Sequence, residues 1–217
     1  MSRTPLLERL RVQLDRSAVV HASELRELGI HHQILRRAVD RGLLTKVDRG
    51  MYLASGRPLD LEQRIILACK RVPHGVICLE SALRFHRILP SGCDVIWMAI
   101  DHRARKPIVK GMQMRFVRFS GDALTQGVIN TRVDGVPVRV YSVAKTVADC
   151  LKYRNKIGVD VAMHNLRESV DQKNCSRERL WHFAKICRVE KLVRLAYASG
   201  SSWYDDARIP QLFVENR

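Results

Sequence analysis

The chain has 217 residues, of which 46% are hydrophobic, and its formal net charge is +16 at pH 7. This length allows one large or two modest globular domains, and the hydrophobic content excludes a chain too polar to build a core. The excess of positive charge indicates an acidic partner, for which nucleic acid is the default.

The first residues predict two helices in succession. Residues 5–16 (PLLERLRVQLDR) form an amphipathic helix whose apolar face is available to cover a helix-turn-helix. Ala22–Leu28 predicts a second, shorter helix, with Ser23 as a candidate N-cap and with Leu25 and Leu28 on one face. This second helix is the first half of the helix-turn-helix.

A glycine turn leads from this helix into an arginine-rich one. Gly29 ends the short helix, because a glycine there adopts positive φ without steric cost, and Ile30 enters the core as the chain turns. A third helix is predicted over about His31–Arg41. At 100° per residue, its inward arc contains Leu35, Ala38, Val39 and Gly42. Its opposite arc contains Gln33, Arg36, Arg37 and Asp40.

The outward arc is typical of a recognition helix. Arginine can bridge O6 and N7 of guanine, and glutamine can bridge N6 and N7 of adenine, in the major groove. The alternative is a solvated basic face. After Gly42, alternating residues up to a turn at Asp48–Gly50 and the return at Met51–Leu53 predict a β-hairpin wing, with Arg49 at its tip and Lys46 on its flank. The predicted DNA-binding residues are His32, Gln33, Arg36, Arg37, Lys46 and Arg49.

A short linker is predicted at residues 54–58, because glycine and proline there interrupt both periodicities. We therefore expect a winged helix-turn-helix domain over 1–55, stable enough to bind DNA alone, and a second domain over 59–217. Lys and Arg exceed Asp and Glu in both parts, by 11 to 6 before residue 59 and by 27 to 16 after it. The positive charge is thus shared by both.

The second domain is expected to mix strands with helices and to end in several helices. Strands are predicted at 76–79, 94–100 and 111–119, with an Asp-Gly hairpin within 127–141. Helices are predicted at 59–71, 80–88, 142–153, 158–170, 176–187 and 190–198. The expected class of the whole chain is α+β, and Trp203, Tyr204 and Phe213 are candidates to pin its tail.

A run without acidic residues lies inside the second domain. From His102 to Arg118 there are six Lys or Arg and no Asp or Glu. Such a run forms a positive surface strip, which is either a solvated loop or a second contact with nucleic acid. The candidate residues of this basic strip are Arg103, Arg105, Lys106 and Lys110.

No pattern in the chain indicates catalysis. Lys145 and Asp149 have the spacing of an i,i+4 ion pair on one helix, for which a structural role is expected. Neither Glu80 nor Asp134 completes the spacing of a metal-dependent nuclease. His74, Cys78 and Cys93 could in principle meet around zinc, but they lack the paired spacing of such sites. We therefore predict no catalytic residue, metal, cofactor or enzymatic activity.

The cysteines and the hydropathy indicate the compartment. None of the six cysteines forms a C-x-x-C pair, and the chain shows neither an apolar leader nor an apolar run of about 18 residues. A cytoplasmic protein with reduced thiols and no membrane partner is expected.

Several motifs resemble one known family. The glycine turn, the arginine-rich helix and the wing VDRGMYLA resemble the N-terminal domain of the AbiEi antitoxins. The resemblance continues through the segments VICLESALRFHRIL (76–89), DVIWMAI (94–100) and VPVRVYSVAKTVADCLKYR (136–154). It covers about residues 6–170 and rests most firmly on the last of these segments.

This resemblance implies an antitoxin of a type IV abortive-infection (phage defence) operon. Family members repress their own promoter by binding inverted repeats in double-stranded DNA, and their C-terminal domain opposes a nucleotidyltransferase-like toxin without a stable complex. The alternatives are a stand-alone winged-helix regulator, or a module that contacts RNA or a toxin and uses the winged helix as an interface.

Overall fold

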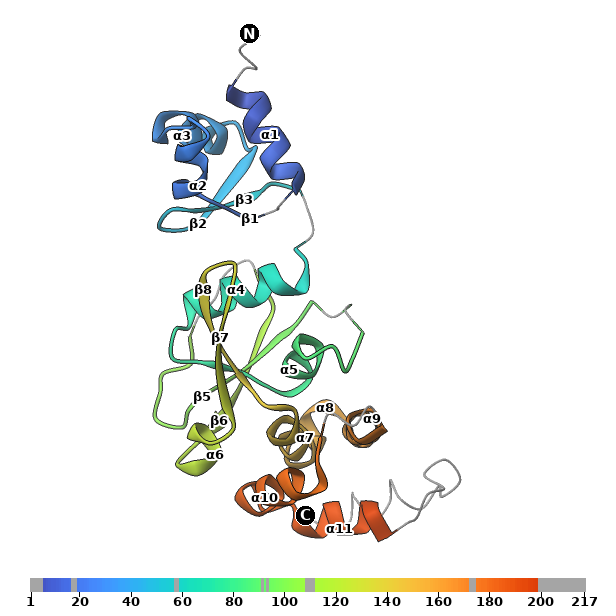
Figure 1. Cartoon of the computed structure of the whole chain (residues 1–217). Coiled ribbons are helices and arrows are strands. Elements are labelled where there is room, and N and C mark those ends of the chain that lie inside the picture. The colour runs from blue at the N-terminus through green and yellow to red at the C-terminus, as the bar shows by residue number, and fades with distance from the viewer. Residues whose placement is uncertain are drawn as a thin grey trace. The chain divides into compact units, whose positions relative to one another are not determined.

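The computed structural model describes residues 6–16, 19–56, 59–90, 92, 94–107, 112–171 and 175–198 (Figure 1). Helices and two β-sheets make up this part of the chain, which confirms the predicted α+β class. The chain divides into two compact units, Met1–Leu67 and Ala68–Arg217. The division falls inside helix α4 (Leu61–Arg71) rather than at 54–58, so the predicted domain boundaries stay a prediction.

The first unit contains a helix-turn-helix and a small sheet. Its elements are α1 (Leu6–Arg16), β1 (Val19–His21), α2 (Ala22–Glu27), α3 (His32–Asp40), β2 (Leu44–Asp48) and β3 (Met51–Ala54). The sheet is antiparallel with β3 in the middle, in the order β1-β3-β2. The sequence predicted the β2–β3 hairpin but not β1.

The core of this unit draws one or two residues from each element. Its buried members are Leu10, Val20, Leu25, Ile30, Leu35, Ala38, Leu44 and Tyr52. Three local predictions were wrong. Leu28, which was placed on one face with the buried Leu25, is 40% exposed, and Gly42, which was placed on the inward arc of α3, is exposed. Both residues come after the last turn of their helix. The N-cap of α2 is His21 rather than Ser23.

The second unit contains a five-stranded mixed sheet. Its strands are β4 (Val76–Ile77), β5 (Ile96–Asp101), β6 (Met114–Phe119), β7 (Val128–Val133) and β8 (Val136–Tyr141), in the order β6-β5-β4-β8-β7. Parallel pairing joins β5 to β6 and β4 to β8, while β4–β5 and β7–β8 are antiparallel. The predicted Asp134-Gly135 hairpin turn joins β7 to β8. Strand β5 is buried from Ile96 to Ile100, as its apolar sequence predicted.

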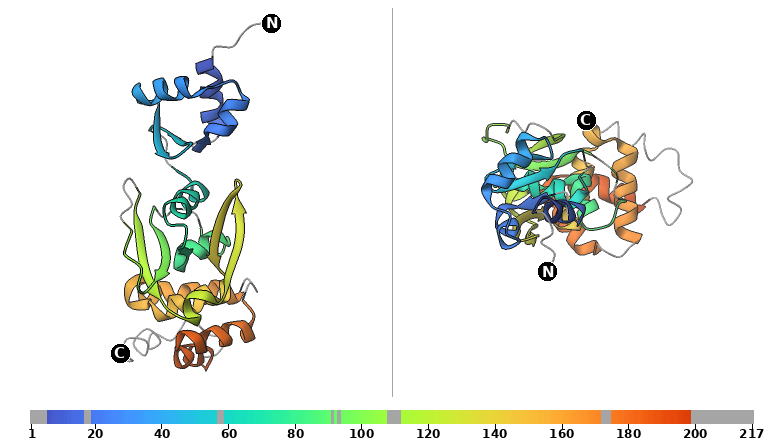
Figure 2. Two further views of the ribbon diagram at one scale, coloured as in Figure 1. Left: turned by 90° about the vertical axis from the view of Figure 1, so that its left-hand side faces the viewer. Right: turned by 90° about the horizontal axis from the view of Figure 1, so that it is seen from above.

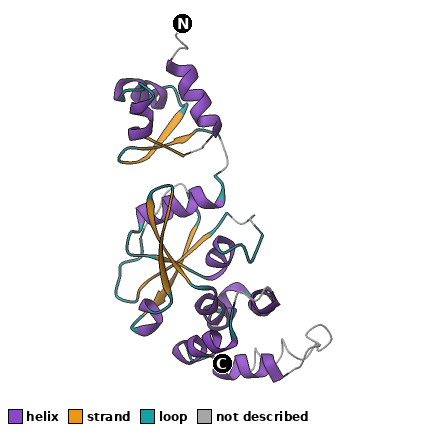
Figure 3. Cartoon of the chain, viewed as in Figure 1, coloured by secondary structure: helices purple, strands orange, loops and turns teal. Residues whose placement is uncertain are grey.

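Helices make up most of the last part of this unit, as the sequence predicted (Figure 3). The helices that follow α4 are α5 (Leu79–Phe85), α6 (Asp122–Thr125), α7 (Val143–Lys152), α8 (Arg154–Ile157), α9 (Val159–Asp171), α10 (Arg177–Cys187) and α11 (Glu190–Ala198), and α7 to α11 form the last part. The short helices α6 and α8 were not predicted. Helix α7 packs against α5, α9 and α10, and Figure 2 shows α7 to α11 gathered on one side of the sheet. The residues proposed to pin the tail lie outside the described residues.

Within the described ranges, no helix combines the length and the hydropathy needed to cross a membrane.

A buried ion pair lies where the sheet meets α7. Lys145 Nζ is 2.6 Å from both carboxylate oxygens of Asp149, and neither side chain is exposed. The ammonium group also lies 4.5 Å from the ring centre of Phe119 and 4.3 Å from that of Tyr141. The thiol of Cys187 donates to Asp149 Oδ1 at 3.2 Å. The predicted i,i+4 pair is therefore confirmed, and residues from β6, β8 and α10 surround it.

Gly127 lets the chain approach this pair closely. It has φ 77°, and a Cβ built there would lie 2.8 Å from Lys145 Cβ and 2.9 Å from Phe183 Cζ. Any other residue would combine backbone strain with a clash. Gly127 is therefore required where β7 begins beside α7.

Removing one member of the ion pair should destabilise the protein strongly. Lys145→Met leaves the Asp149 carboxylate buried without its counter-charge, which should lower the free energy of unfolding by about 3–5 kcal/mol. Burial raises the pKa of Asp149, and losing Lys145 raises it further. The folded variant then takes up a proton before the unfolded chain does, so its stability should recover as the pH falls.

Urea unfolding followed by circular dichroism measures both effects. The double variant Lys145→Met/Asp149→Leu should be more stable than the single variant, because it buries no charge. Lys152→Met on the same helix, where the lysine is exposed, is the matched control and should change stability by about 0.5 kcal/mol or less. A single variant as stable as the double variant would contradict this account.

Limited proteolysis tests the predicted boundary at 54–58. We expect subtilisin to cut first within 54–60 and to release a C-terminal fragment that resists further cleavage. First cuts confined to α4 would instead place the boundary at the division between the two compact units. The fragments are identified by mass spectrometry.

Candidate nucleic-acid interface

The turn between α2 and α3 sets the direction of the second helix. Gly29 has φ 78°, and its N–H donates to the carbonyl of Arg26 at 2.9 Å. The N–H of Ile30 donates to the carbonyl of Leu25 at 2.8 Å, and the Ile30 side chain is 1% exposed. The turn is thus closed by backbone hydrogen bonds and anchored in the core, as the sequence predicted.

Helix α3 has one buried and one exposed face. Leu35 and Ala38 are buried, and Ile34 and Val39 pack against the same core. The other side chains of the helix are exposed: His32, Gln33, Arg36, Arg37 and Asp40. Burial of the apolar arc therefore orients the polar arc toward solvent, where it can reach the edges of bases.

The predicted wing is supported on both sides. Strand β3 pairs with β2 on one edge and with β1 on the other, and the N–H of Ala22 donates to the carbonyl of Gly50 at 2.7 Å. This bond ties the turn of the wing to the start of α2. Lys46 on β2 and Arg49 in the turn are both exposed, with a register shift between Lys46 and Asp48. The wing thus presents two cations from a braced hairpin, which suits contacts to phosphate.

The predicted basic strip lies in the second unit, where β5 ends. Asp101 turns the chain by accepting the N–H of Arg103 at 2.8 Å, and Arg118 donates to the carbonyl of His102. The exposed cations of the loop are Arg103, Arg105 and Lys106, while Lys110 lies outside the described residues. Further along, Arg115 and Arg118 are exposed on β6, an edge strand of the sheet.

The structure thus groups the predicted site residues in two places. The six predicted DNA-binding residues lie on α3 and on the wing of the first unit, and the described residues of the strip lie in the second. Their roles stay predictions. Sequence patterns had not selected Arg71 and Arg139, which border one cavity together with Arg105.

A family model described as "Transcriptional regulator, AbiEi antitoxin" matches residues 10–54. The resemblance to AbiEi antitoxins is therefore confirmed, and the matched residues include α2, α3 and the wing. This match supports a DNA-binding antitoxin regulator, and the family is one of regulators rather than of enzymes. The resemblance of residues 76–154 to the C-terminal domain of AbiEi antitoxins lies outside the matched range.

A solved structure extends the comparison to the fold of almost the whole chain. The RV2827C protein from Mycobacterium tuberculosis is similar with a TM-score of 0.56 and 18% sequence identity. The similarity covers 97% of this chain and 81% of that one. At this identity the likeness concerns the fold alone. A comparison with curated proteins gives no match.

Arginines that read bases and cations that hold phosphate should respond differently to substitution. Arg36→Ala or Arg37→Ala should cost about 1–3 kcal/mol of binding free energy at one base position, because a bidentate contact is lost. Lys46→Ala or Arg49→Ala should weaken binding to all sequences alike and reduce the salt slope by about one unit. Mobility-shift assays on the upstream region of the gene, repeated at several salt concentrations, measure both.

Two control variants make this test specific. Arg36→Lys keeps the charge but loses the planar fork, so it should lose base preference and keep the salt slope. Lys185→Ala removes an exposed cation from α10 and should leave binding unchanged. Unchanged binding by the double variant Arg36→Ala/Arg37→Ala would show that α3 is not the recognition helix.

Proposed function

We propose that the protein represses its own promoter by binding double-stranded DNA, and that it is the antitoxin of a toxin–antitoxin pair. The observation that carries this proposal is the exposed face of α3, with two arginines and a glutamine beside a wing that bears two cations. The family match over residues 10–54 supports the same function for the same residues.

The recognition step depends on the two faces of α3. Leu35 and Ala38 hold one face in the core, so the helix enters the major groove with Arg36, Arg37 and Gln33 toward the bases. His32 lies in the first turn of α3, the end of a recognition helix that contacts bases. Lys46 and Arg49 neutralise backbone phosphates and fix the register of the helix.

Inverted repeats in the operator imply two copies of the chain on one DNA. Each copy reads one half-site, and the half-sites lie about one helical turn apart, or a multiple of that distance. Binding at such a site in the promoter, in the cytoplasm, represses transcription. Binding to DNA also accounts for the high positive charge of the chain, because its Lys and Arg side chains neutralise the DNA phosphates.

We assign the antitoxin activity to the second unit, and this activity is separate from repression. The basic strip there carries Arg103, Arg105 and Lys106 in exposed positions, away from α3 in the sequence. A domain that binds RNA or another acidic factor through such residues opposes a nucleotidyltransferase-like toxin without a stable complex with it. The operon then acts in phage defence.

One variant separates the two activities. Neutralising Arg103, Arg105, Lys106 and Lys110 by alanine should abolish the rescue of toxin-expressing cells, while promoter repression persists because α3 and the wing are unchanged. Cell survival and promoter activity are measured in parallel, and circular dichroism checks the fold.

A matched control removes the same charge from exposed positions elsewhere in the second unit, namely Arg132, Lys152, Lys156 and Lys185. It should keep both activities. Full rescue by the strip variant would exclude the strip as the antitoxin site, and loss of repression as well would assign the strip to DNA affinity. Repression by the native protein without any rescue would favour a stand-alone regulator.

A further inference from the structure

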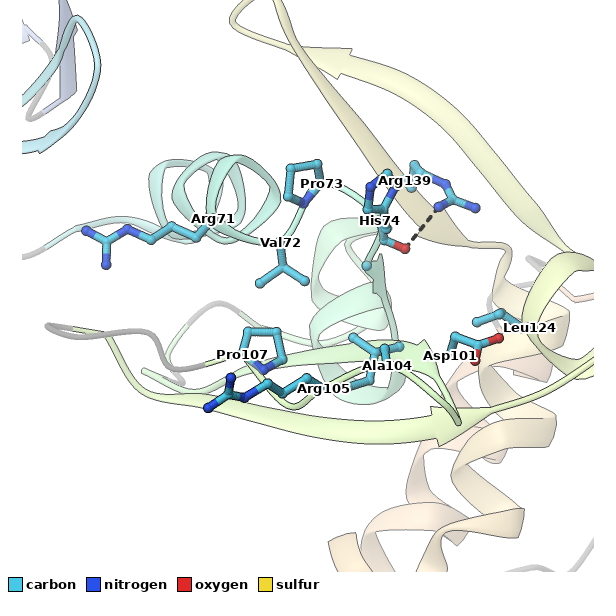
Figure 4. Close-up of a pocket in the computed structure, with 12 residues that line it drawn as sticks. Arg71, Val72, Pro73, His74, Asp101, Ala104, Arg105, Pro107, Leu124 and Arg139 are labelled. Carbon is cyan, nitrogen blue, oxygen red and sulfur yellow. Dashed lines mark hydrogen bonds between the residues drawn. The ribbon is translucent and has the colours of Figure 1, made fainter.

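A cavity of about 440 Å³ lies in the second unit beside the loop that carries Arg105. Its walls come from the end of α4 and the turn after it, the end of β5 and the loop after that strand, α6, and β8 (Figure 4). Four segments far apart in the sequence thus border one hollow. Its volume falls within the range of about 300–1,000 Å³ that is usual for small-molecule sites.

Part of the wall is apolar. Val72 and Ile100 are 6% and 4% exposed, and Ala104, Pro107 and Leu124 also border the cavity. In Figure 4 the Val72 side chain points into the space between α4 and the β5 loop. A ligand that fills the cavity must therefore present an apolar or planar surface to this wall.

Cations dominate the polar part of the lining. The described lining residues include three arginines, Arg71, Arg105 and Arg139, and one carboxylate, Asp101, so these four groups carry a net charge of +2. Guanidinium groups bind the oxygens of phosphate in pairs, and they also stack on planar rings. The lining therefore favours an anionic ligand.

Two of the polar groups are held in place by the backbone. Arg139 Nη1 donates to the carbonyl of His74 at 3.0 Å, drawn as the dashed line in Figure 4. An arginine has five N–H donors, so this bond holds the side chain without using all of its capacity to donate. Asp101 Oδ1 accepts from the N–H of Arg103 at 2.8 Å. Its carboxylate has capacity for further hydrogen bonds, for example from a sugar hydroxyl or a base N–H.

The polar groups are distributed along the cavity. In Figure 4 the guanidinium groups of Arg71 and Arg105 extend toward one end, while Asp101 lies toward the other, near Leu124. A matching ligand has an anionic end, an apolar planar middle and hydrogen-bond donors. Inorganic phosphate lacks the second feature and would make no contact with the apolar wall, and a nucleic-acid duplex is too wide to enter.

We propose that this cavity binds a nucleoside phosphate, with the phosphate at Arg71 and Arg105 and the nucleoside against the wall formed by Val72 and Pro107. Arg139 and Asp101 orient the ligand from the other side. The ligand is either a free nucleotide or the phosphorylated end of an RNA strand, which share this chemistry. Binding here does not depend on DNA recognition by α3.

Titration calorimetry of the full chain with the common ribonucleoside 5′-monophosphates tests this proposal. At least one should bind, and the corresponding nucleoside should bind about tenfold more weakly or worse, because it lacks the charge-assisted bonds. Arg105→Ala and Arg139→Ala should each weaken binding about tenfold. Ala104→Trp, which fills the cavity without changing the charge, should abolish it.

The control is Arg132→Ala, which removes an exposed arginine of β7 that does not line the cavity. It should leave nucleotide affinity unchanged, and thermal melting checks that every variant is folded. The proposal is overturned if no monophosphate binds, if the nucleoside binds equally well, or if Arg132→Ala weakens binding as much as Arg105→Ala. Full binding by a folded Ala104→Trp variant would also overturn it.

Competition with short RNA oligonucleotides distinguishes the two sources of the ligand. Displacement of the monophosphate by RNA with a 5′-phosphate, but not by the same RNA with a 5′-hydroxyl, identifies the end of a strand as a ligand. Displacement by neither supports a free nucleotide. Equal displacement by both would show that backbone phosphates suffice, which contradicts a site for a terminal nucleoside phosphate.

Discussion

The second unit depends on a pair of charges that have no access to water. Burying a lysine and an aspartate costs several kcal/mol per ion, and only close pairing and further hydrogen bonds offset this cost. Lys145 and Asp149 meet these conditions. The ammonium group contacts both carboxylate oxygens and lies over two aromatic rings, and the carboxylate also accepts a hydrogen bond from the thiol of Cys187. Burial raises the pKa of Cys187 to about 12, so the thiol keeps its proton and donates a hydrogen bond to Asp149.

This pair also fixes how the parts of the unit meet. Its partners come from β6, β8 and α10, and it stays satisfied only while all three keep their positions around α7. The strands β6 and β8 and the loop after β5 also carry the exposed arginines of the basic strip and two arginines of the cavity, Arg105 and Arg139. The buried pair thus joins elements that also carry exposed charges. A polar pair of this kind favours one packing over its alternatives.

In the first unit, packing decides which face of α3 is available. The apolar residues of α3 face a core built from α1, α2 and the sheet, so its arginines face outward. The wing adds cations next to that face because β1 and the start of α2 brace the hairpin. Each unit therefore presents positive charge from a different structural element.

Local patterns in the sequence were sufficient for most of the helices and strands. Some features depend only on residues that are close in the sequence, and these could be predicted. They include helical and alternating periodicity, the turns at Gly29 and at Asp134-Gly135, the two faces of α3, and the spacing of Lys145 and Asp149. Strand β1 has three residues, and α6 and α8 have four each, which is too short for any period to be visible. Their structure comes from their neighbours.

The sequence by itself determined the class of the fold, the helix-turn-helix with its wing and the positive charge of both parts. Only the tertiary structure decided that the Lys145–Asp149 pair is fully buried, because Phe119, Tyr141 and Cys187 reach it from other elements. The same holds for the cavity, which Arg71, Arg105 and Arg139 border from three separate segments. Residues so far apart along the chain form no recognisable spacing pattern in the sequence. The order in which the strands pair brings them together.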